Sequence, residues 1–310
     1  MSRVVRVAMT ETKNAYAGMP ASEAELESLA GNLEDVRQAN LEHNTRLIEH
    51  AAGLGARIVG LGELFPAPYF ALETRAVWRG FAEDAHTGAT FKHMAAVARK
   101  HGVILVAPIY EVEPGGKRFN TALVIDEVGS LLGTYRKTHI PFGTNEIASF
   151  HENFYYERSD GRAFVDERHN LSENPYFPVF RTKFARLGVA ICYDRHFEGV
   201  VSSLAAGGAE LVLCPAVSFG EKSQRMWRQE AATDALRQKL YIGASNRLGA
   251  EPPWTVEYYG DSHVVGPNGP CEDVSDHDEL VVADCDFAAL EGCDSSGWNI
   301  PRDRRDDIYR

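Results

Sequence analysis

The sequence predicts an α/β protein in which mixed β-sheets are flanked by helices. Short apolar runs of strand length alternate with longer segments whose apolar residues recur at helical spacing. Strand pairs separated only by turn residues lie between these units, which is typical of β-hairpins and not of a purely parallel barrel. The 310 residues contain no low-complexity linker and no strict short-period repeat. One domain spanning residues 1–310 is therefore expected.

The first half of the chain contains the clearest alternation. Residues 32–53 predict a helix ended by Gly53, because their apolar residues recur on one face. The expected buried positions of this helix are Leu33, Val36, Leu47, Ile48, Ala51 and Ala52. The other predicted elements are strands over 4–9, 57–62 and 103–110, a helix over 90–100, and a hairpin of 119–126 with 131–135.

The second half continues the pattern. Its predicted elements are a hairpin-like pair at 177–184 and 187–192, helices over 199–208 and 222–239, and strands over 210–215, 240–246, 258–265 and 280–286. Met226, Ala231 and Leu236 are expected to be buried on the long helix. A polar insertion at about 157–176 and a charged tail at about 294–310 interrupt this compact pattern. The insertion is expected to be a functional lid, an interaction surface or a merely tolerated insertion, and the tail to pack on a partner subunit or to be a solvated end.

Composition excludes several classes of function. A net charge of −12 argues against a sequence-independent nucleic-acid binder, which needs a basic surface, and gives no attraction to anionic membranes. No apolar run approaches the length that spans a bilayer, and Met1 to Met9 predicts a strand instead of a signal peptide. We therefore expect a soluble cytoplasmic protein.

Cysteine spacing gives no metal or disulfide framework. The five cysteines are Cys192, Cys214, Cys271, Cys285 and Cys293, an odd number without C-x-x-C spacing. His151 and Glu152 begin like a zinc-protease motif, but Tyr155 stands where the second His is needed. The glycine pairs at 53–55 and 60–62 do not continue into a nucleotide-binding loop. The residues therefore support neither a zinc site nor nucleotide binding, and the family resemblance given below implies no metal and no organic cofactor.

Three chemically useful residues follow predicted strands. Glu63, Lys137 and Cys192 stand at or just after strand ends, where sheet proteins assemble sites. A Glu held away from water can take a thiol proton, the thiolate can attack an acyl carbon, and Lys can stabilise the oxyanion. The helix expected after Cys192 would lower the pKa of its thiol. Taken one at a time, a turn cap, a solvated charge and an inert core thiol are equally good interpretations.

The sequence segments around these three residues resemble the signatures of a known family. Residues 62–66 (Gly-Glu-Leu-Phe-Pro), 135–141 (Tyr-Arg-Lys-Thr-His-Ile-Pro) and 189–194 (Val-Ala-Ile-Cys-Tyr-Asp) resemble the three signatures of the carbon–nitrogen hydrolase (nitrilase) superfamily. Glu63 and Lys137 are 74 positions apart, and Lys137 and Cys192 are 55 positions apart. Residues 207–211 and 244–247 resemble later family segments. Residues 296–299 and 302–305 resemble the tail of the β-ureidopropionase branch.

The resemblance implies a four-layer αββα sandwich that forms a homodimer or a higher homo-oligomer through its helices. It implies Glu63 as general base and acid, Lys137 as oxyanion stabiliser and Cys192 as nucleophile, with the backbone N–H of Tyr193 completing the oxyanion hole. It also implies a second glutamate near the lysine. Glu152 matches it best, with Glu146 as the competing choice, and its expected role is to orient Lys137.

Arg195 bears on the substrate. It follows Cys192 by three residues, and its planar fork suits a carboxylate. The resemblance to N-carbamoyl amino acid hydrolases implies this use, whereas pairing with Asp194 or another acid is the alternative. His139 and His196 are expected to line the pocket or to be structural hydrogen-bonders. Phe197 and Glu198 depart from the aromatic-Pro-Glu pattern of relatives, which leaves substrate identity open.

The leading hypothesis is hydrolysis of an N-carbamoyl amino acid, such as N-carbamoyl-β-alanine, to the amino acid, ammonia and carbon dioxide through a cysteine thioester. An amidase or an N-carbamoylputrescine-type hydrolase of the same superfamily is the enzymatic alternative. A catalytically silent binding or assembly module is the alternative from another class.

Overall fold

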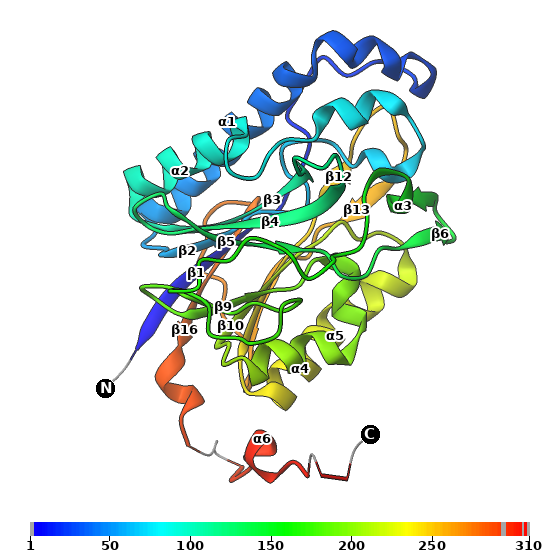
Figure 1. Cartoon of the computed structure of the whole chain (residues 1–310). Coiled ribbons are helices and arrows are strands. Elements are labelled where there is room, and N and C mark those ends of the chain that lie inside the picture. Colours follow the sequence, from blue (N-terminus) through cyan, green and yellow to red (C-terminus); the bar gives the residue numbers. More distant parts are fainter. Residues whose placement is uncertain (1–2, 293–295, 306, 309–310) are drawn as a thin grey trace.

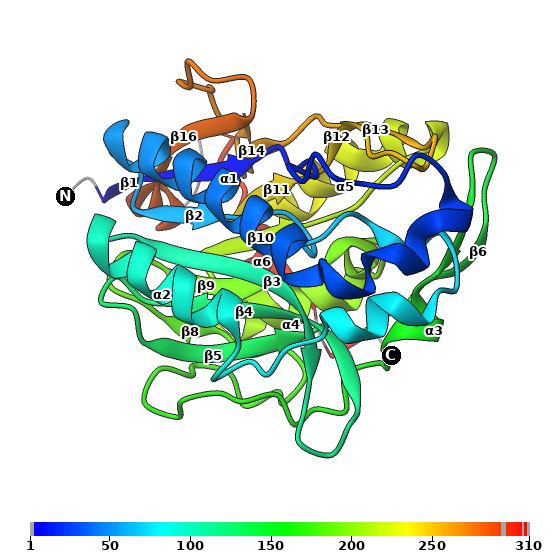
Figure 2. The same ribbon diagram turned by 90° about the horizontal axis from the view of Figure 1, so that it is seen from above.

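The computed structural model describes residues 3–292, 296–305 and 307–308, so Cys293 lies outside the described residues. Two six-stranded sheets pack face to face between two layers of helices (Figure 1). The helices α1 (Leu33–Gly53) and α2 (Ala89–His101) lie side by side over one sheet (Figure 2), and α4 (Glu198–Ala206) and α5 (Glu221–Gln238) cover the other. This is the four-layer αββα sandwich that the sequence resemblance implies.

Sheet one is built mainly from the first half of the chain. Its strands in spatial order are β16 (Leu280–Asp286), β1 (Val4–Thr10), β2 (Ile58–Gly60), β3 (Ile104–Val112), β4 (Arg118–Ile125) and β5 (Leu131–Arg136). The strands β1, β2 and β3 are parallel, and β3, β4 and β5 form an antiparallel meander. The last strand, β16, returns to pair antiparallel with β1, placing Asp286 opposite Val4.

Sheet two is built from the second half. Its strands in spatial order are β15 (Gly269–Pro270), β14 (His263–Gly266), β11 (Tyr241–Ser245), β10 (Leu211–Pro215), β9 (Arg186–Val189) and β8 (Phe180–Arg181). The central strands β9, β10 and β11 are parallel. Two hairpins lie outside both sheets, one of β6 (Phe142–Thr144) with β7 (Ser149–His151), the other of β12 (Leu248–Ala250) with β13 (Glu257–Tyr259).

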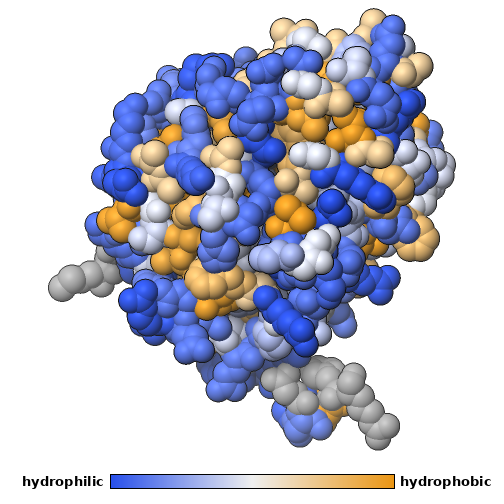
Figure 3. Space-filling model, turned by 45° about the horizontal axis from the view of Figure 1, so that its top comes forward, coloured by the Kyte–Doolittle hydropathy of each residue, from blue (hydrophilic) through white to orange (hydrophobic). Residues whose placement is uncertain are grey.

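Short helices complete the chain. They are α3 (Glu152–Tyr155), α6 (Ile300–Asp303) and the 3₁₀ helices η1 (Glu23–Gly31), η2 (Phe70–Leu72), η3 (Ala76–Phe81), η4 (Cys192–His196) and η5 (Phe287–Leu290). No helix among the described residues is both long enough and apolar enough to cross a membrane. On the face shown in Figure 3, hydrophilic side chains predominate and hydrophobic ones form separate patches.

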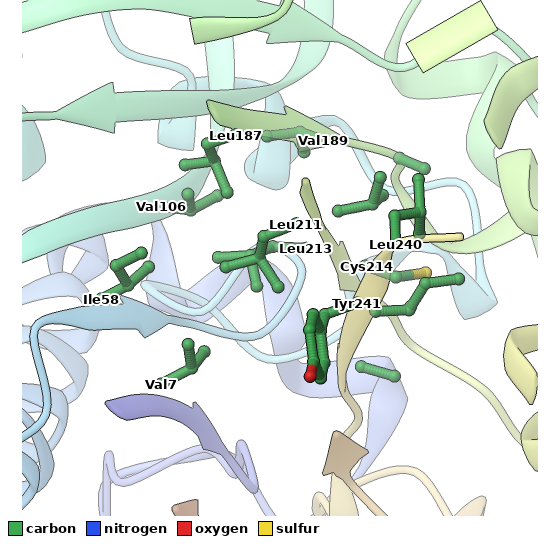
Figure 4. Packing of buried hydrophobic residues seen from close by; sticks show 14 of the residues in the cluster. Val7, Ile58, Val106, Leu187, Val189, Leu211, Leu213, Cys214, Leu240 and Tyr241 are labelled. Carbon is green, nitrogen blue, oxygen red and sulfur yellow. The ribbon is translucent and has the colours of Figure 1, made fainter. Parts of the chain in front are cut away.

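The principal core lies between the two sheets. Val7 and Ile58 of sheet one face the same cluster as Leu187 and Leu213 of sheet two, and all four side chains are fully buried (Figure 4). The alternate residues of the same strands, such as Val59, point to the opposite face and pack under α1 and α2. Because both faces of these strands are buried, their sequences are nearly continuous apolar runs.

Most predicted elements are confirmed. Leu33, Ala52, Met226 and Ala231 are only partly buried, whereas full burial was expected, and two further details are wrong. The strand predicted over 258–265 is broken into β13 and β14, because Gly260 and Asp261 adopt φ values of +63° and +64°, which a strand does not allow. Leu236 is 37% exposed. The buried stripe of α5 runs through Trp227 and Ala235 instead, so Leu236 falls one position to the side of it.

The polar insertion packs beside the edge of sheet one. Phe164 O accepts the backbone N–H of Thr134 at 2.6 Å, and Val165 forms an antiparallel bridge with Gly133 of β5. The insertion therefore covers an exposed strand edge, which would otherwise offer unpaired backbone groups.

In the C-terminal tail, Asn299 caps α6 by accepting the N–H of Arg302.

Candidate active site

Glu63, Lys137 and Cys192 converge where the two sheets meet. Glu63 follows β2, Lys137 follows β5, and Cys192 begins η4 just after β9. Lys137 Nζ donates to Glu63 Oε1 at 2.7 Å, and both side chains are fully buried. Cys192 is 6% exposed. Two sheets built from different halves of the chain therefore contribute to one site.

Glu63 is held by three further residues. Its Oε1 accepts the side-chain amide of Asn120 at 2.7 Å, and its Oε2 accepts the backbone N–H of Val217 at 2.8 Å. The turn that follows contains Leu64 at φ +52°, a costly conformation for a branched side chain. Buried Arg247 stabilises this turn, because its Nη2 donates to the carbonyls of Glu63 and Leu64 at 3.1 Å each.

The structure brings Glu152, and not Glu146, to the lysine. Lys137 Nζ donates to Glu152 Oε2 at 2.6 Å, and Tyr69 Oη donates to Glu152 Oε1 at 2.9 Å. Glu146 instead accepts the backbone N–H of Glu221 at the start of α5, at 2.6 Å. The spacing in the sequence left both choices open, and the geometry separates them.

This cluster contains one cation and two carboxylates. Burial raises the pKa of Glu152, and Glu63 adds to the rise, against the opposing effect of Lys137. Burial alone would lower the pKa of Lys137, but Glu152 and Glu63 outweigh it and hold the pKa above its usual value. Lys137 therefore stays charged, and Glu152 retains a proton more readily than an exposed carboxyl group does.

Cys192 lies in a strained conformation next to this cluster. Its φ is +50°, and its Sγ donates to the carbonyl of Val217 at 3.3 Å. Burial raises the pKa of the thiol, Glu63 raises it further, and Lys137 and Arg195 oppose the rise. The expectation that a following helix lowers this pKa is wrong, because η4 is only five residues long and burial dominates. Burial therefore favours the neutral thiol over the thiolate.

The turn formed by residues 191–194, which we call the elbow, is fixed by Asp194. This residue was not selected from the sequence alone. Its fully buried carboxylate accepts the N–H of Ile191 at 3.0 Å, the hydroxyl of Tyr135 at 2.6 Å, and both the backbone N–H and Nδ1 of His139 at 3.0 and 2.8 Å. The ring of His139 stacks on Phe197 with centroids 3.8 Å apart. His139 is not among the residues that line the pocket, so it braces the elbow.

A pocket of about 580 Å³ opens onto Cys192. Tyr193, Arg195 and His196 line it together with Cys192 and Glu152. Its other lining residues are Tyr69, Pro141, Asn145, Glu146, Phe150, Val217, Ser218, Phe219, Lys222, Ser223, Met226 and Glu230. Three of the four predicted substrate-binding residues thus surround the opening to the thiol, and His139 is the exception.

Arg195 reaches back over the thiol. Its Nη1 donates to the carbonyl of Cys192 at 2.9 Å and lies 3.9 Å from Cys192 Sγ. The acid it pairs with is Glu230, at 3.3 Å, and not its neighbour Asp194. The arginine is therefore both ion-paired and part of the pocket wall, which combines the two interpretations that the sequence left open.

Tyr69, Asn120, Asp194 and Arg247 are the site residues that sequence reasoning missed. Arg247 lies in the family-like segment 244–247, and Asp194 ends the cysteine signature, so both carried a signal. Tyr69 and Asn120 carried none, because each reaches its carboxylate across more than fifty residues of chain, Tyr69 to Glu152 and Asn120 to Glu63. Within the described residues, no group of three or more His, Cys, Asp or Glu side chains is arranged to hold a metal ion.

Comparison with known proteins places these features in one family. The family model for carbon-nitrogen hydrolase matches residues 30–293. N-carbamoylputrescine amidase from Arabidopsis thaliana is 30% identical over 304 residues, covering 93% of this chain and 94% of that protein. Beta-ureidopropionase from the same plant is 30% identical over 259 residues, covering 78% of this chain and 59% of that protein.

Solved structures agree with the fold. A carbon-nitrogen hydrolase from Helicobacter pylori G27 is 25% identical, with a TM-score of 0.77 over 99% of this chain and 97% of that one. The alternative of a catalytically silent binding or assembly module is not supported, because the relatives are named as amidases and hydrolases. The chain belongs to the carbon–nitrogen hydrolase family of the nitrilase superfamily and is a hydrolase of carbon–nitrogen bonds other than peptide bonds.

Proposed function

We propose that this hydrolase cleaves the carbamoyl carbon–nitrogen bond of an N-carbamoyl amino acid, such as N-carbamoyl-β-alanine, in which only a short chain separates the carbamoyl group from the carboxylate. The observation that supports this most is the guanidinium of Arg195, 3.9 Å from Cys192 Sγ in the wall of the pocket. A carboxylate a few bonds away from the carbamoyl carbon can reach that guanidinium while the carbon is at the thiol.

In the proposed reaction, Cys192 Sγ attacks the carbamoyl carbon as Glu63 takes the thiol proton. This timing follows from the raised pKa of the thiol, which leaves little thiolate at rest. Val217 supports the transfer, because its backbone binds both groups, accepting from Cys192 Sγ at 3.3 Å and donating to Glu63 at 2.8 Å.

The oxyanion that forms is stabilised in this proposal by Lys137 and the backbone N–H of Tyr193. Glu63 then returns its proton to the leaving ammonia, and a thioester remains on Cys192. Water, activated by Glu63, hydrolyses the thioester, and the carbamate released decomposes to the amino acid and carbon dioxide. Glu152 acts by orienting Lys137, to which it is bound at 2.6 Å.

Ammonia release from N-carbamoyl-β-alanine and from uncharged N-propylurea tests the proposal. We expect kcat/KM to favour the carboxylate substrate at least about 10-fold, which corresponds to about 1.4 kcal/mol of transition-state binding. Arg195→Lys should reduce that preference by raising KM for N-carbamoyl-β-alanine alone, because an ammonium cannot bind a carboxylate in a fork. Good turnover of simple amides without any turnover of N-carbamoyl-β-alanine would refute the substrate assignment.

A second candidate is an N-carbamoylputrescine-type substrate with a cationic end. Glu146 and Glu230 line the same pocket and could bind an ammonium group. This candidate predicts turnover of N-carbamoylputrescine above that of N-carbamoyl-β-alanine, and indifference to Arg195→Lys. Homodimerisation through the helices stays a prediction, which light scattering of the purified protein would check.

A further inference from the structure

One stripe of helix α5 encloses the guanidinium of Arg195. Ser223, Trp227 and Glu230 are spaced four and three residues apart, so they lie on the same face of the helix. Arg195 Nη2 donates to Ser223 Oγ at 2.9 Å, Arg195 Cζ lies 4.9 Å from the centroid of the Trp227 ring, and Arg195 Nε lies 3.3 Å from Glu230 Oε2. We call these three residues the α5 cradle.

The cradle and the elbow together hold all three guanidinium nitrogens. Nη1 is bound to the carbonyl of Cys192 at 2.9 Å, Nη2 to Ser223, and Nε faces Glu230. The Arg195 side chain is 9% exposed. An arginine has five N–H donors, so Nη2 keeps a donor after these contacts, and the long 3.9 Å contact from Nη1 to Sγ can be replaced by a better acceptor.

The charged groups around Arg195 determine whether its guanidinium can bind a ligand. Burial works against the charge of Arg195, but its pKa is raised, by Cys192 above all and with a smaller contribution from Glu230. Glu230 also accepts from His196 Nδ1 at 2.7 Å, so it is itself held in place. Its Oε2 approaches Arg195 Nε without the alignment of a hydrogen bond. Glu230 therefore faces the Nε side of the guanidinium, and the Nη edge stays available to a ligand.

Such fixing matters because a free arginine loses much of its rotamer freedom when it binds a ligand. Here packing on Trp227 and the two polar contacts impose that order before a substrate arrives. We propose that Ser223, Trp227 and Glu230 are positioning residues that pre-orient Arg195 toward the carboxylate of the substrate, so that α5 sets the selectivity for anionic substrates. This inference rests on the proposed function of Arg195.

The test is Glu230→Gln with N-carbamoyl-β-alanine and N-propylurea as paired substrates. We expect KM for N-carbamoyl-β-alanine to rise about 10-fold or more relative to KM for N-propylurea. Ser223→Ala should have a smaller effect of the same kind, and Glu230→Asp should restore part of the loss. Glu221→Gln is the matched control, because Glu221 is an exposed acid on the same helix.

A substrate-independent readout separates this inference from the proposed function. The dissociation constant of propionate is measured by calorimetry for the intact chain and for Glu230→Gln, with propionamide as the neutral comparison. Weaker propionate binding in Glu230→Gln supports the cradle even if N-carbamoyl-β-alanine is not a substrate. Unchanged propionate binding, or equal losses for propionate and propionamide, overturns it.

Discussion

Lys137 and Glu63, 74 residues apart in the chain, are joined by a 2.7 Å hydrogen bond in the fully buried interior. Lys137 also binds Glu152 at 2.6 Å, so a single ammonium group is the partner of two carboxyl groups. Removing one member of such a group leaves charge that water cannot reach. The stability of the fold and the chemistry of the site therefore depend on the same side chains.

Lys137→Met should destabilise the protein by about 3–5 kcal/mol at pH 7, because both carboxylates lose their partner. The pKa of Glu152 is already raised by burial, so the folded state binds its proton more tightly than the unfolded chain does. The stability that this proton provides is present below the unfolded pKa and is lost as pH rises through the folded pKa. The deficit of Lys137→Met should therefore shrink between pH 7 and pH 5, as measured by urea unfolding. A deficit independent of pH would contradict this account.

Glu63→Gln separates two effects of Glu63 on Cys192. Its charge raises the pKa of the thiol, so removing it should favour the thiolate, whereas removing a base should slow proton loss. We expect the second effect to win, with the rate of iodoacetamide labelling of Cys192 at pH 7 falling about 10-fold or more, in the range of general-base effects. Partly exposed Cys271 serves as an internal control in the same mass spectrum. Faster labelling of Cys192 in the variant would show that Glu63 acts only through its charge.

Gly220→Ala should loosen the β6–β7 hairpin, whose Glu146 is bound to the start of α5. Gly220 has φ +92°, and an added Cβ would lie 2.8 Å from Glu146 Oε1. We expect KM to rise several-fold, since Glu146 and Asn145 line the pocket, and stability to fall by about 1 kcal/mol or more. Gly102→Ala is the control, because Gly102 also has a positive φ, of +63°, but its Cβ would meet nothing within 4 Å. Identical KM values for the two variants would show that the contact with Glu146 does not shape the pocket.

Arg247→Met should lower stability by about 3–5 kcal/mol, because it leaves its ion-pair partner Glu251 buried and unpaired and frees backbone carbonyls of the turn after Glu63. Thermal unfolding followed by circular dichroism measures the loss. The double variant Arg247→Met/Glu251→Gln should recover part of it, since the unpaired charge is then gone. No recovery would assign the whole loss to the turn carbonyls.

Local patterns in the sequence were sufficient to predict the strands that carry the site, but they were insufficient to predict the contacts between its side chains. The runs that end near Glu63, Lys137 and Cys192 are apolar because both faces of each sheet are buried. Strands of this kind can therefore be recognised from the sequence alone. By contrast, Glu146 and Glu152 both follow Lys137 within a short stretch, and only the fold of the β6–β7 hairpin decides which one turns inward. The Glu230 partner of Arg195 is 35 residues further along the chain, on another helix. Such choices depend on tertiary packing, which periodicity does not encode.

The pairing of β16 with β1 has a consequence for biosynthesis. Sheet one begins with residue 4, yet its outer strand is complete only at residue 286. Until those last residues leave the ribosome, the seven-residue strand β1 has an open edge whose N–H and C=O groups can recruit a strand from another nascent chain. A transcript truncated before Leu280 would thus yield aggregates, even though it encodes Glu63, Lys137 and Cys192.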